Sequence, residues 1–301
     1  MEMTDYVASR KDEFIPSTLT AFDYDGKYWG VPQVTGAGML YRRTDQVPEA
    51  PKSWQELYRA SAENDGMAYQ GAPYEGLTCN FLELAAAVGG RVLSEDGTKA
   101  ELDSPENLEA LKFMVEGVEN GAAERASVTY MEEPARLAFE SGKVTFMRNW
   151  SYAYALGNEA PKVKGRFEVT PLPPFEGGDS GGVLGGNGPV VTAFSENPKG
   201  AMLWVDHWTS AETIRRNAAE YALPPTLVAA YDEPSVKKAI PYAAQLRSAV
   251  EQASPRPVSP VYPQISQAIY KNVNAALGGK TSPEEALKNG QRQIEQALSA
   301  F

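Results

Sequence analysis

The stretch RNWSYAY, residues 148–154, places planar polar side chains beside aromatic ones directly after an apolar run. Arg148 and Asn149 carry hydrogen-bonding groups, and Trp150, Tyr152 and Tyr154 offer flat rings. A sugar ring has an apolar face that stacks on aromatic rings and a fringe of hydroxyls, so this mixture suits a saccharide. A structural reading is equally open, in which Trp150 fills a core while Arg148 and Asn149 cap a helix.

Carboxylates could support a different chemistry, the hydrolysis of glycosidic bonds, which needs two acids about 5 to 10 Å apart. Glu132 and Glu133 stand in the first turn of an expected helix, where the helix dipole favours negative charge, so a structural role is expected. Glu75, beside Tyr74 at the start of another helix, and Glu83 are stronger candidates. An enzymatic reading would therefore use Glu75 with a second carboxylate.

Other catalytic and metal-binding arrangements find little support. Walker, HExxH and CxxC motifs are absent from the sequence, and the serine of GGDSGG, residues 177–182, lacks the strand-to-helix context of a nucleophile elbow, so a flexible connector is expected there. Cys79 is the single cysteine and lies in an apolar run, which predicts a buried thiol. His207 is the single histidine and is expected on the flank of an amphipathic helix. We therefore expect no metal and no cofactor.

Composition favours a globular protein of two domains. The chain has 301 residues, of which 43% are hydrophobic and 22% charged. Its net charge of -11 excludes the basic surface that a nucleic-acid partner needs. No apolar run approaches the roughly 18 residues of a membrane-spanning helix, and the first residues do not resemble an export signal peptide.

Elements that could position these residues follow from turn and capping signals. Asp25 and Gly26 predict a turn between two short strands, and apolar strands are expected at 38–42, 144–150 and 189–195. Helices are expected after the N-caps Ser53, Ser104 and Ser282, over 76–88, and over 197–220. Because helices and strands alternate, the fold class is α/β with an at least partly parallel sheet.

Three longer stretches resemble one protein family. They are DGKYWGVPQVTGAGMLYRRTD, GAPYEGLTCNFLELAAAVGG and FESGKVTFMRNWSYAYAL, and the tail RPVSPVYPQISQAIYKNVNAALGGKTSPEEALK supports them. All are similar to the sugar-binding proteins of ABC importers, the maltose/trehalose type of extracellular solute-binding protein (family 1). The resemblance covers essentially the whole chain.

This resemblance implies a two-lobed periplasmic-binding-protein-like fold of type II. Residues 1–35 and 172–232 would form the first lobe, and 36–171 and 233–301 the second. The crossings are expected near Thr35, near 171–174 and near 230–235. A di- or oligosaccharide would bind between the lobes, close them by a hinge motion and be delivered to a membrane permease.

The resemblance also assigns ligand-binding residues by position. Trp150 matches the family's aromatic sugar platform, and Asn187 stands in GGNG where many relatives have Gly-Gly-Trp, so one stacking face is replaced by an amide. The full set of expected ligand contacts is Trp150, Asn149, Arg148, Tyr152, Tyr74, Glu75, Thr35, Gly36, Asn187 and Tyr262.

Compared with the family, the sequence begins about 100 residues into the usual order of segments, so the first lobe is expected to be incomplete. Ligand binding by this chain alone is therefore expected to be weak or absent. Relatives are exported to the periplasm or tethered as lipoproteins, which implies an extracytoplasmic location. The expected partners are a carbohydrate and the permease subunits of an ABC transporter, with the protein itself a monomer. Two alternatives stay open, a glycoside-processing enzyme and a nonfunctional or interaction fragment of a binding protein.

Overall fold

Residue contacts divide the chain into two compact units, each built from two separate stretches. The computed structural model describes residues 1–178 and 180–300. The first unit comprises Met1–Ala37 and Leu184–Pro255, and the second comprises Gly38–Val183 and Arg256–Phe301. The family resemblance predicts boundaries at 35/36, 171/172 and 232/233. Residues 233–255 lie in the first unit because the helix Ala243–Gln252 packs there against a strand and a second helix.

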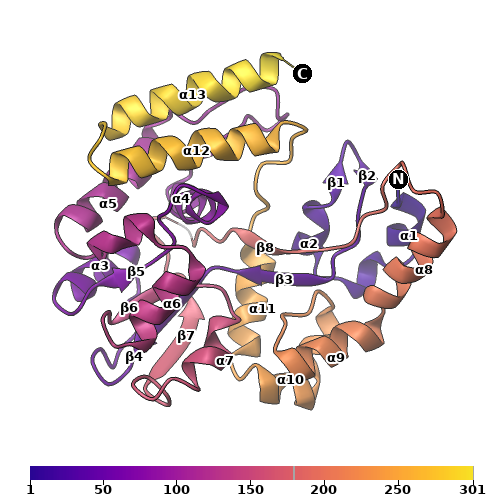
Figure 1. Ribbon diagram of the computed structural model, residues 1–301, viewed down its shortest axis with the longest axis horizontal. Helices are drawn as coiled ribbons and strands as arrows, with labels where there is room; N and C mark the ends of the chain where they lie inside the picture. Colours follow the sequence, from indigo (N-terminus) through magenta and orange to yellow (C-terminus); the bar gives the residue numbers. More distant parts are fainter. Residues whose placement is uncertain (179, 301) are drawn as a thin grey trace. The chain divides into compact units, whose positions relative to one another are not determined.

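The first unit is mostly helical (Figure 1). Its helices are α1 (Thr4–Ala8), η1 (Lys11–Glu13), α2 (Pro16–Thr20), α8 (Pro198–Trp208), α9 (Ala211–Tyr221), η3 (Val228–Asp232), α10 (Pro234–Ala239) and α11 (Ala243–Gln252). Its strands are β1 (Asp23–Tyr24), β2 (Lys27–Tyr28), β3 (Val34–Ala37) and β8 (Leu184–Asn187). The predicted turn between β1 and β2 is confirmed, since Asp25 and Gly26 have φ values of 55° and 70°.

Two expectations for the first unit are wrong. No strand occurs over 189–195; the strand lies just before it, at β8, which pairs antiparallel with β3. Pro189 lacks an N–H, and its carbonyl instead accepts a hydrogen bond from Val31 N at 3.2 Å. The single helix expected over 197–220 is two helices, because Ser210 caps α9 by accepting a hydrogen bond from Thr213 N. His207 lies exposed on α8, as its flanking position predicts.

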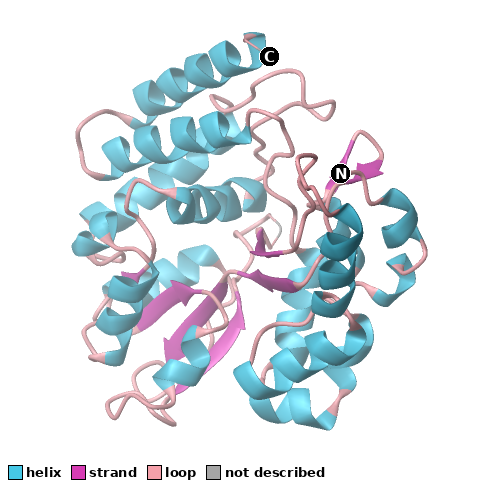
Figure 2. Ribbon diagram, turned by 45° about the vertical axis from the view of Figure 1, so that its right-hand side comes forward, coloured by secondary structure: helices cyan, strands magenta, loops and turns pink. Residues whose placement is uncertain are grey.

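The second unit contains a four-stranded sheet in the order β5-β6-β4-β7. Its strands are among those drawn in magenta in Figure 2. Its strands are β4 (Met39–Arg43), β5 (Met67–Ala68), β6 (Phe146–Asn149) and β7 (Phe167–Pro171). Only the β5–β6 pair is parallel, and the other pairs are antiparallel. The strands over 38–42 and 144–150 are thus confirmed with small shifts, and the sheet is partly parallel as predicted.

Most of the second unit's helices begin where the sequence predicts. Its helices are α3 (Trp54–Ala62), α4 (Glu75–Ala87), α5 (Pro105–Glu119), η2 (Arg125–Thr129), α6 (Glu132–Glu140), α7 (Ala153–Gly157), α12 (Tyr262–Leu277) and α13 (Pro283–Ser299). The side chains of Ser53, Ser104 and Ser282 each accept a hydrogen bond from the third residue of the following helix, which confirms all three predicted caps.

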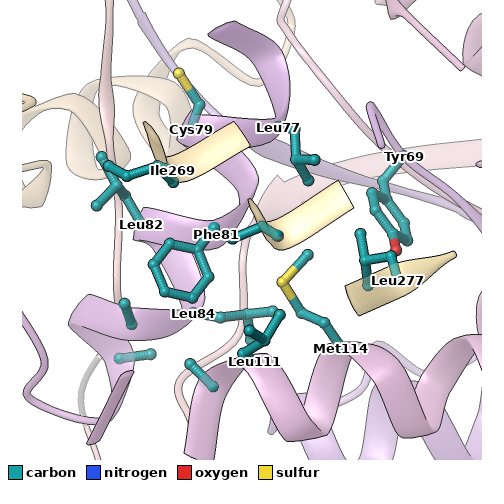
Figure 3. Packing of buried hydrophobic residues seen from close by; sticks show 14 of the residues in the cluster. Tyr69, Leu77, Cys79, Phe81, Leu82, Leu84, Leu111, Met114, Ile269 and Leu277 are labelled. Atoms are coloured by element: carbon teal, nitrogen blue, oxygen red, sulfur yellow. The ribbon is translucent and has the colours of Figure 1, made fainter. Parts of the chain in front are cut away.

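The core of the second unit surrounds α4. Nearly every residue of this helix is buried, and its apolar side chains pack against α5 and α12. Figure 3 shows Phe81 among Leu82, Leu84, Leu111 and Ile269. Cys79 is buried in the same cluster, which confirms its predicted place as a small apolar side chain. α12 and α13 run side by side along the unit (Figure 1).

Among residues 1–178 and 180–300, no helix has the length and hydropathy of a membrane span. The same residues hold no group of three His, Cys, Asp or Glu side chains arranged to bind a metal ion. Of the GGDSGG stretch, Asp179 lies outside the described residues.

Candidate ligand-binding site

Trp150 lies directly after strand β6, at a point where the buried sheet gives way to the surface. Its side chain is partly buried and packs against the edge of the main core. One face of the indole meets the guanidinium of Arg148, whose Cζ is 4.0 Å from the ring centroid. The indole Nε1 donates to Oε1 of Glu132 at 3.4 Å. The ring is therefore held at one face and at its polar edge.

Arg148 does not reach the surface, which corrects the expectation that it meets ligand hydroxyls. Its side chain is 0% exposed and forms a buried ion pair with Glu83, which is 1% exposed. Arg148 Nε donates to Glu83 Oε2 at 2.9 Å, and Nη1 donates to Gln70 Oε1 at 3.0 Å. Despite burial, the Glu83 carboxylate raises the pKa of Arg148, so the guanidinium remains charged. Arg148 supports the site from beneath.

Asn149 is also fully buried, so its expected contact with ligand is corrected as well. Its Nδ2 donates to the backbone carbonyl of Glu132 at 3.1 Å, and its Oδ1 accepts from Trp150 N at 2.8 Å. The amide thus ties the end of β6 to the start of α6. Asn149 is buried but, contrary to the structural reading, does not cap a helix, because neither α6 nor α7 has a side-chain cap. Trp150 remains partly accessible.

Two tyrosines extend the aromatic surface beside the start of α6. Tyr152 is partly buried, and its hydroxyl donates to Glu133 Oε1 at 2.6 Å. Tyr74 is partly buried and precedes α4. Burial raises the pKa of Tyr74, and the neighbouring Glu132 carboxylate raises it further. Because Glu132 also contacts the Trp150 indole, Tyr74 and Trp150 adjoin the same carboxylate.

A second polar group forms around Glu75, the first residue of α4. Its carboxylate accepts hydrogen bonds from the hydroxyls of Tyr262 and Ser266 and from Arg256 Nη1, the last at 2.7 Å. The side chains of Glu75 and Arg256 are 38% and 31% exposed. Burial raises the pKa of Tyr262, and its hydrogen bond to Glu75 raises it further, so the phenol stays protonated. Since Tyr74 and Glu75 are consecutive, this group adjoins the aromatic one.

The remaining predicted residues lie in the first unit, on one small sheet. Thr35 and Gly36 belong to β3 and pair with Gly186 and Gly185 of β8, whereas Asn187 pairs with Val34. Thr35 Oγ1 is buried without a hydrogen-bond partner, and the side chain of Asn187 is exposed. The unit therefore brings these three residues together on neighbouring strands.

Sequence reasoning missed several residues of the second unit's site. Arg256 stands in the RPVSPVY stretch that carried the family resemblance, yet its residue type alone gave no role. Glu132 has the position at the start of a helix that the sequence predicts, and in addition it holds the indole. Gln70 and Ser266 contact Arg148 and Glu75 from distant parts of the chain, and no local pattern marks either.

Glu75 and Glu83, the two carboxylates considered for an enzymatic role, both accept hydrogen bonds from other side chains of the protein. Glu83 is buried against Arg148, where neither substrate nor water has access to it. Glu75 accepts hydrogen bonds on both oxygens from Tyr262, Ser266 and Arg256. A general acid must carry an exchangeable proton toward the scissile bond, and neither carboxylate has that arrangement.

The chain as a whole is similar to known solute-binding proteins. The family model described as "Bacterial extracellular solute-binding protein" matches residues 1–244. A relative from Deinococcus radiodurans named "Probable ABC transporter-binding protein" is 34% identical over 289 residues, covering 89% of this chain and 69% of the relative. Against the next curated relatives, the chain spans less than half of their length.

Solved structures show the same architecture. The structure titled "Maltose bound T. maritima MalE3" has a TM-score of 0.90 at 35% identity, covering 98% of this chain and 80% of that one. The GacH receptor of Streptomyces glaucescens, solved unliganded and with acarbose, has a TM-score of 0.84 at 25% identity, covering 96% of this chain and 76% of that one. These matches confirm the predicted two-lobed, periplasmic-binding-protein-like α/β fold.

Proposed function

Because the chain belongs to the bacterial extracellular solute-binding protein family, we propose that it is the carbohydrate-binding component of an ABC transporter. Its ligand is a di- or oligosaccharide of the maltose or trehalose kind. The proposal is supported by the maltose-bound neighbour at 35% identity and by the acarbose-bound receptor at 25% identity.

The partly exposed indole of Trp150 is the observation that carries this proposal. One face is covered by Arg148 and the polar edge is held by Glu132, so the other face offers a fixed flat surface. A pyranose ring can stack on such a surface through its C–H groups, and little side-chain entropy is lost because the indole is already held.

Polar groups beside the indole would provide the hydrogen bonds. Arg256 is partly exposed and keeps donors beyond the one directed at Glu75, and the hydroxyl of Tyr262 stays protonated. Tyr74 is proposed to contribute its partly exposed ring, because its hydroxyl oxygen is buried. Tyr152 adds a further ring near the start of α6. In the first unit, the exposed Asn187 is proposed as a ligand contact, whereas Thr35 and Gly36 are buried in β3, which corrects the expectation that they meet the ligand.

Calorimetry with maltose tests the assignment of Trp150. Trp150→Ala should weaken binding by about 1 to 3 kcal/mol, as expected for loss of a stacking aromatic. Trp208→Ala is the matched control, because Trp208 is an exposed tryptophan of the first unit on α8 and outside the proposed contacts. Equal affinity of the wild type and Trp150→Ala would refute the stacking role.

The proposal also states that the protein binds its ligand without cleaving it. Both candidate carboxylates are occupied, so maltose and trehalose should be recovered intact after prolonged incubation with the protein. Chromatography of the sugar decides this point, and release of glucose in proportion to protein concentration would favour a glycoside-processing enzyme.

The proposed setting follows from the family. We propose an extracytoplasmic location, in the periplasm or at the cell surface, with the permease subunits of an ABC transporter as partners and the protein itself a monomer. Light scattering of the purified protein measures its mass, and a stable dimer would contradict the last statement.

A further inference from the structure

We propose that the buried ion pair of Arg148 and Glu83 positions Trp150, holding the indole so that its free face is ready for a sugar ring. Neither residue of the pair touches the ligand in this scheme, and Arg148 acts only through Trp150. The inference rests on the proposed function where it concerns sugar affinity, whereas the positioning of the indole is measurable without any ligand.

The contact between the guanidinium and the indole is direct. Arg148 Cζ lies 4.0 Å from the ring centroid, the distance of two planar groups in contact. A guanidinium is flat and weakly hydrated, so it stacks on an aromatic face better than an ammonium does. With Glu132 at Nε1, the indole is restrained both across its face and in its plane.

The guanidinium itself cannot move easily. Glu83 accepts hydrogen bonds from Nε and Nη2 of Arg148, a paired arrangement that fixes the plane of the group. Gln70 accepts from Nη1 at 3.0 Å, and its own Nε2 donates to the backbone carbonyl of Arg148 at 3.1 Å. Asn80 Nδ2 donates to the backbone carbonyl of Gln70 at 2.9 Å. A hydrogen-bonded network of this kind stiffens its members.

Gly38 shows that the backbone passes tightly over this pair. A Cβ atom added to Gly38 would lie 2.2 Å from Oε1 of Glu83 and 2.6 Å from Nη2 of Arg148. The space above the pair is therefore closed by the chain. Gly38→Ala offers a way to displace the pair without removing either charge.

The cost of the pair argues for a role beyond stability. Burying two charges is expensive, and apolar residues of similar volume often serve a core equally well. A methionine in place of Arg148 could fill the volume, but its flexible chain would not present a flat, fixed plane to the indole. The feature that the charged pair supplies is orientation.

The main test is a mutant cycle that removes the Arg148–Glu83 ion pair in the presence and in the absence of Trp150. The double variant Glu83→Gln, Arg148→Met removes both charges and so avoids leaving one unpaired in the core. Calorimetry should show maltose binding about three- to thirtyfold weaker than in the wild type, the range expected for loss of a desolvated cation–π contact. In a Trp150→Ala background the same double change should alter affinity less than about twofold, because the group through which it acts is gone.

Two outcomes of this cycle overturn the proposal. One is an unchanged affinity in the double variant with Trp150 present. The other is the same fold loss in both backgrounds, since that result assigns the pair a general structural role. Arg148→Lys with Glu83 retained keeps the positive charge but loses the planar guanidinium, so its affinity for maltose should stay below that of the wild type.

A spectroscopic readout needs no sugar. With 5-fluorotryptophan incorporated, the ¹⁹F resonance of Trp150 is identified by its loss in Trp150→Phe. The double variant, or Gly38→Ala should the double variant fail to fold, should shift or broaden that resonance while the other four tryptophans of the sequence keep theirs. An unchanged Trp150 resonance rejects the positioning role. If the wild type binds no sugar, the proposed function fails, and this measurement still decides whether the pair positions the indole.

Discussion

The two units of the chain differ in how completely they cover their apolar residues. The second unit has a large core around α4 and can accommodate a charged pair and a thiol inside it. The first unit is the smaller one, and its buried apolar residues lie in a cluster that includes Phe14 and Leu227 and along α10 and α11, where Val236, Leu246 and Val250 are buried. Most of the large apolar side chains that are exposed belong to the first unit, namely Met1, Tyr24, Trp29, Val190, Phe194, Leu203, Trp204, Trp208 and Tyr221.

This difference has a consequence for the rigidity and stability of each unit. A large core can offset the cost of buried polar groups, so the second unit can hold Arg148, Gln70 and Asn80 in fixed positions beneath Trp150. The first unit leaves more of its large apolar side chains in water, so burial opposes chain entropy less completely there and its stability should be lower. We expect the two units to unfold in separate transitions, with the first unit unfolding at the lower denaturant concentration.

The largest expected effect comes from breaking the buried ion pair. Arg148→Ala leaves the Glu83 carboxylate unpaired in the core, which should lower the free energy of unfolding of the second unit by about 3 to 5 kcal/mol. Urea unfolding followed by hydrogen exchange measures the change and assigns it to a unit.

Arg247→Ala in α11 is the matched control in the first unit. Arg247 pairs with Glu251 on the helix surface, with side chains 32% and 42% exposed. Exposed pairs contribute about 0 to 1 kcal/mol, so its loss should hardly move the transition of the first unit. A similar cost for the two arginine variants would contradict the contrast between the units.

A second comparison truncates one leucine in each core. Leu111 of α5 is fully buried in the core of the second unit, and Leu111→Ala should cost about 4 kcal/mol because a large packed core relaxes little around a cavity. Leu227→Ala in the smaller cluster of the first unit should cost about 2 kcal/mol, since fewer neighbours hold the cavity open. Denaturant midpoints of the corresponding transitions measure both, and a larger cost for Leu227→Ala would reverse the ranking.

The elements that sequence reasoning predicted well are those decided by local chemistry. The caps at Ser53, Ser104 and Ser282 depend on the three residues that follow, and the turn at Asp25 and Gly26 depends on positive φ values. The strand expected over 189–195 failed because strand formation depends on a partner. β3 pairs with Leu184–Asn187, and nothing local to the apolar run that follows indicates this choice.

In the candidate site too, features that depend on local sequence were predicted, and those that depend on distant residues were not. The sequence predicted a flat aromatic at Trp150 and a carboxylate at Glu75 where the helix α4 begins. It could not predict the burial of Arg148, because that depends on Glu83, 65 positions earlier. Asn149 likewise became structural only because the carbonyl of Glu132 lies within reach of its amide. Such contacts are determined by tertiary packing and leave no periodic signal.

The thiol of Cys79 gives a smaller effect that depends on pH. Burial raises its pKa from 9.0 to about 12, with Arg256 and Arg148 acting in the opposite direction. The folded state therefore holds this proton more tightly than the unfolded state does. Its stabilising contribution is fully present below pH 9 and is lost as pH rises from 9 toward 12. At pH 10 the loss should be about 1.4 kcal/mol in the second unit.

Comparison with Cys79→Ala isolates this contribution from other groups that titrate at high pH. The difference between wild type and Cys79→Ala in the free energy of unfolding of the second unit should become smaller from pH 8 to pH 10. The first unit contains no cysteine, so its transition should show no such difference at either pH. A difference of constant size across this pH range would mean that the thiol is not desolvated.

The smallest effect on folding stability, and the sharpest test of the contrast between units, concerns the surface of α8. Leu203 and Trp204 are 73% and 54% exposed, and Trp204 contacts Trp208 one turn later. Leu203→Gln should change the free energy of unfolding by less than about 0.5 kcal/mol, because the side chain is already in water. It should nevertheless slow aggregation, since neighbouring exposed apolar groups promote association whereas single ones do not.

Leu137→Gln in α6 of the second unit is the control, with Leu137 at 54% exposure. Light scattering at high protein concentration should show slower aggregation for Leu203→Gln than for Leu137→Gln; equal rates would mean that the exposed residues of α8 act singly, and the contrast in surface cover would then have no consequence for solubility.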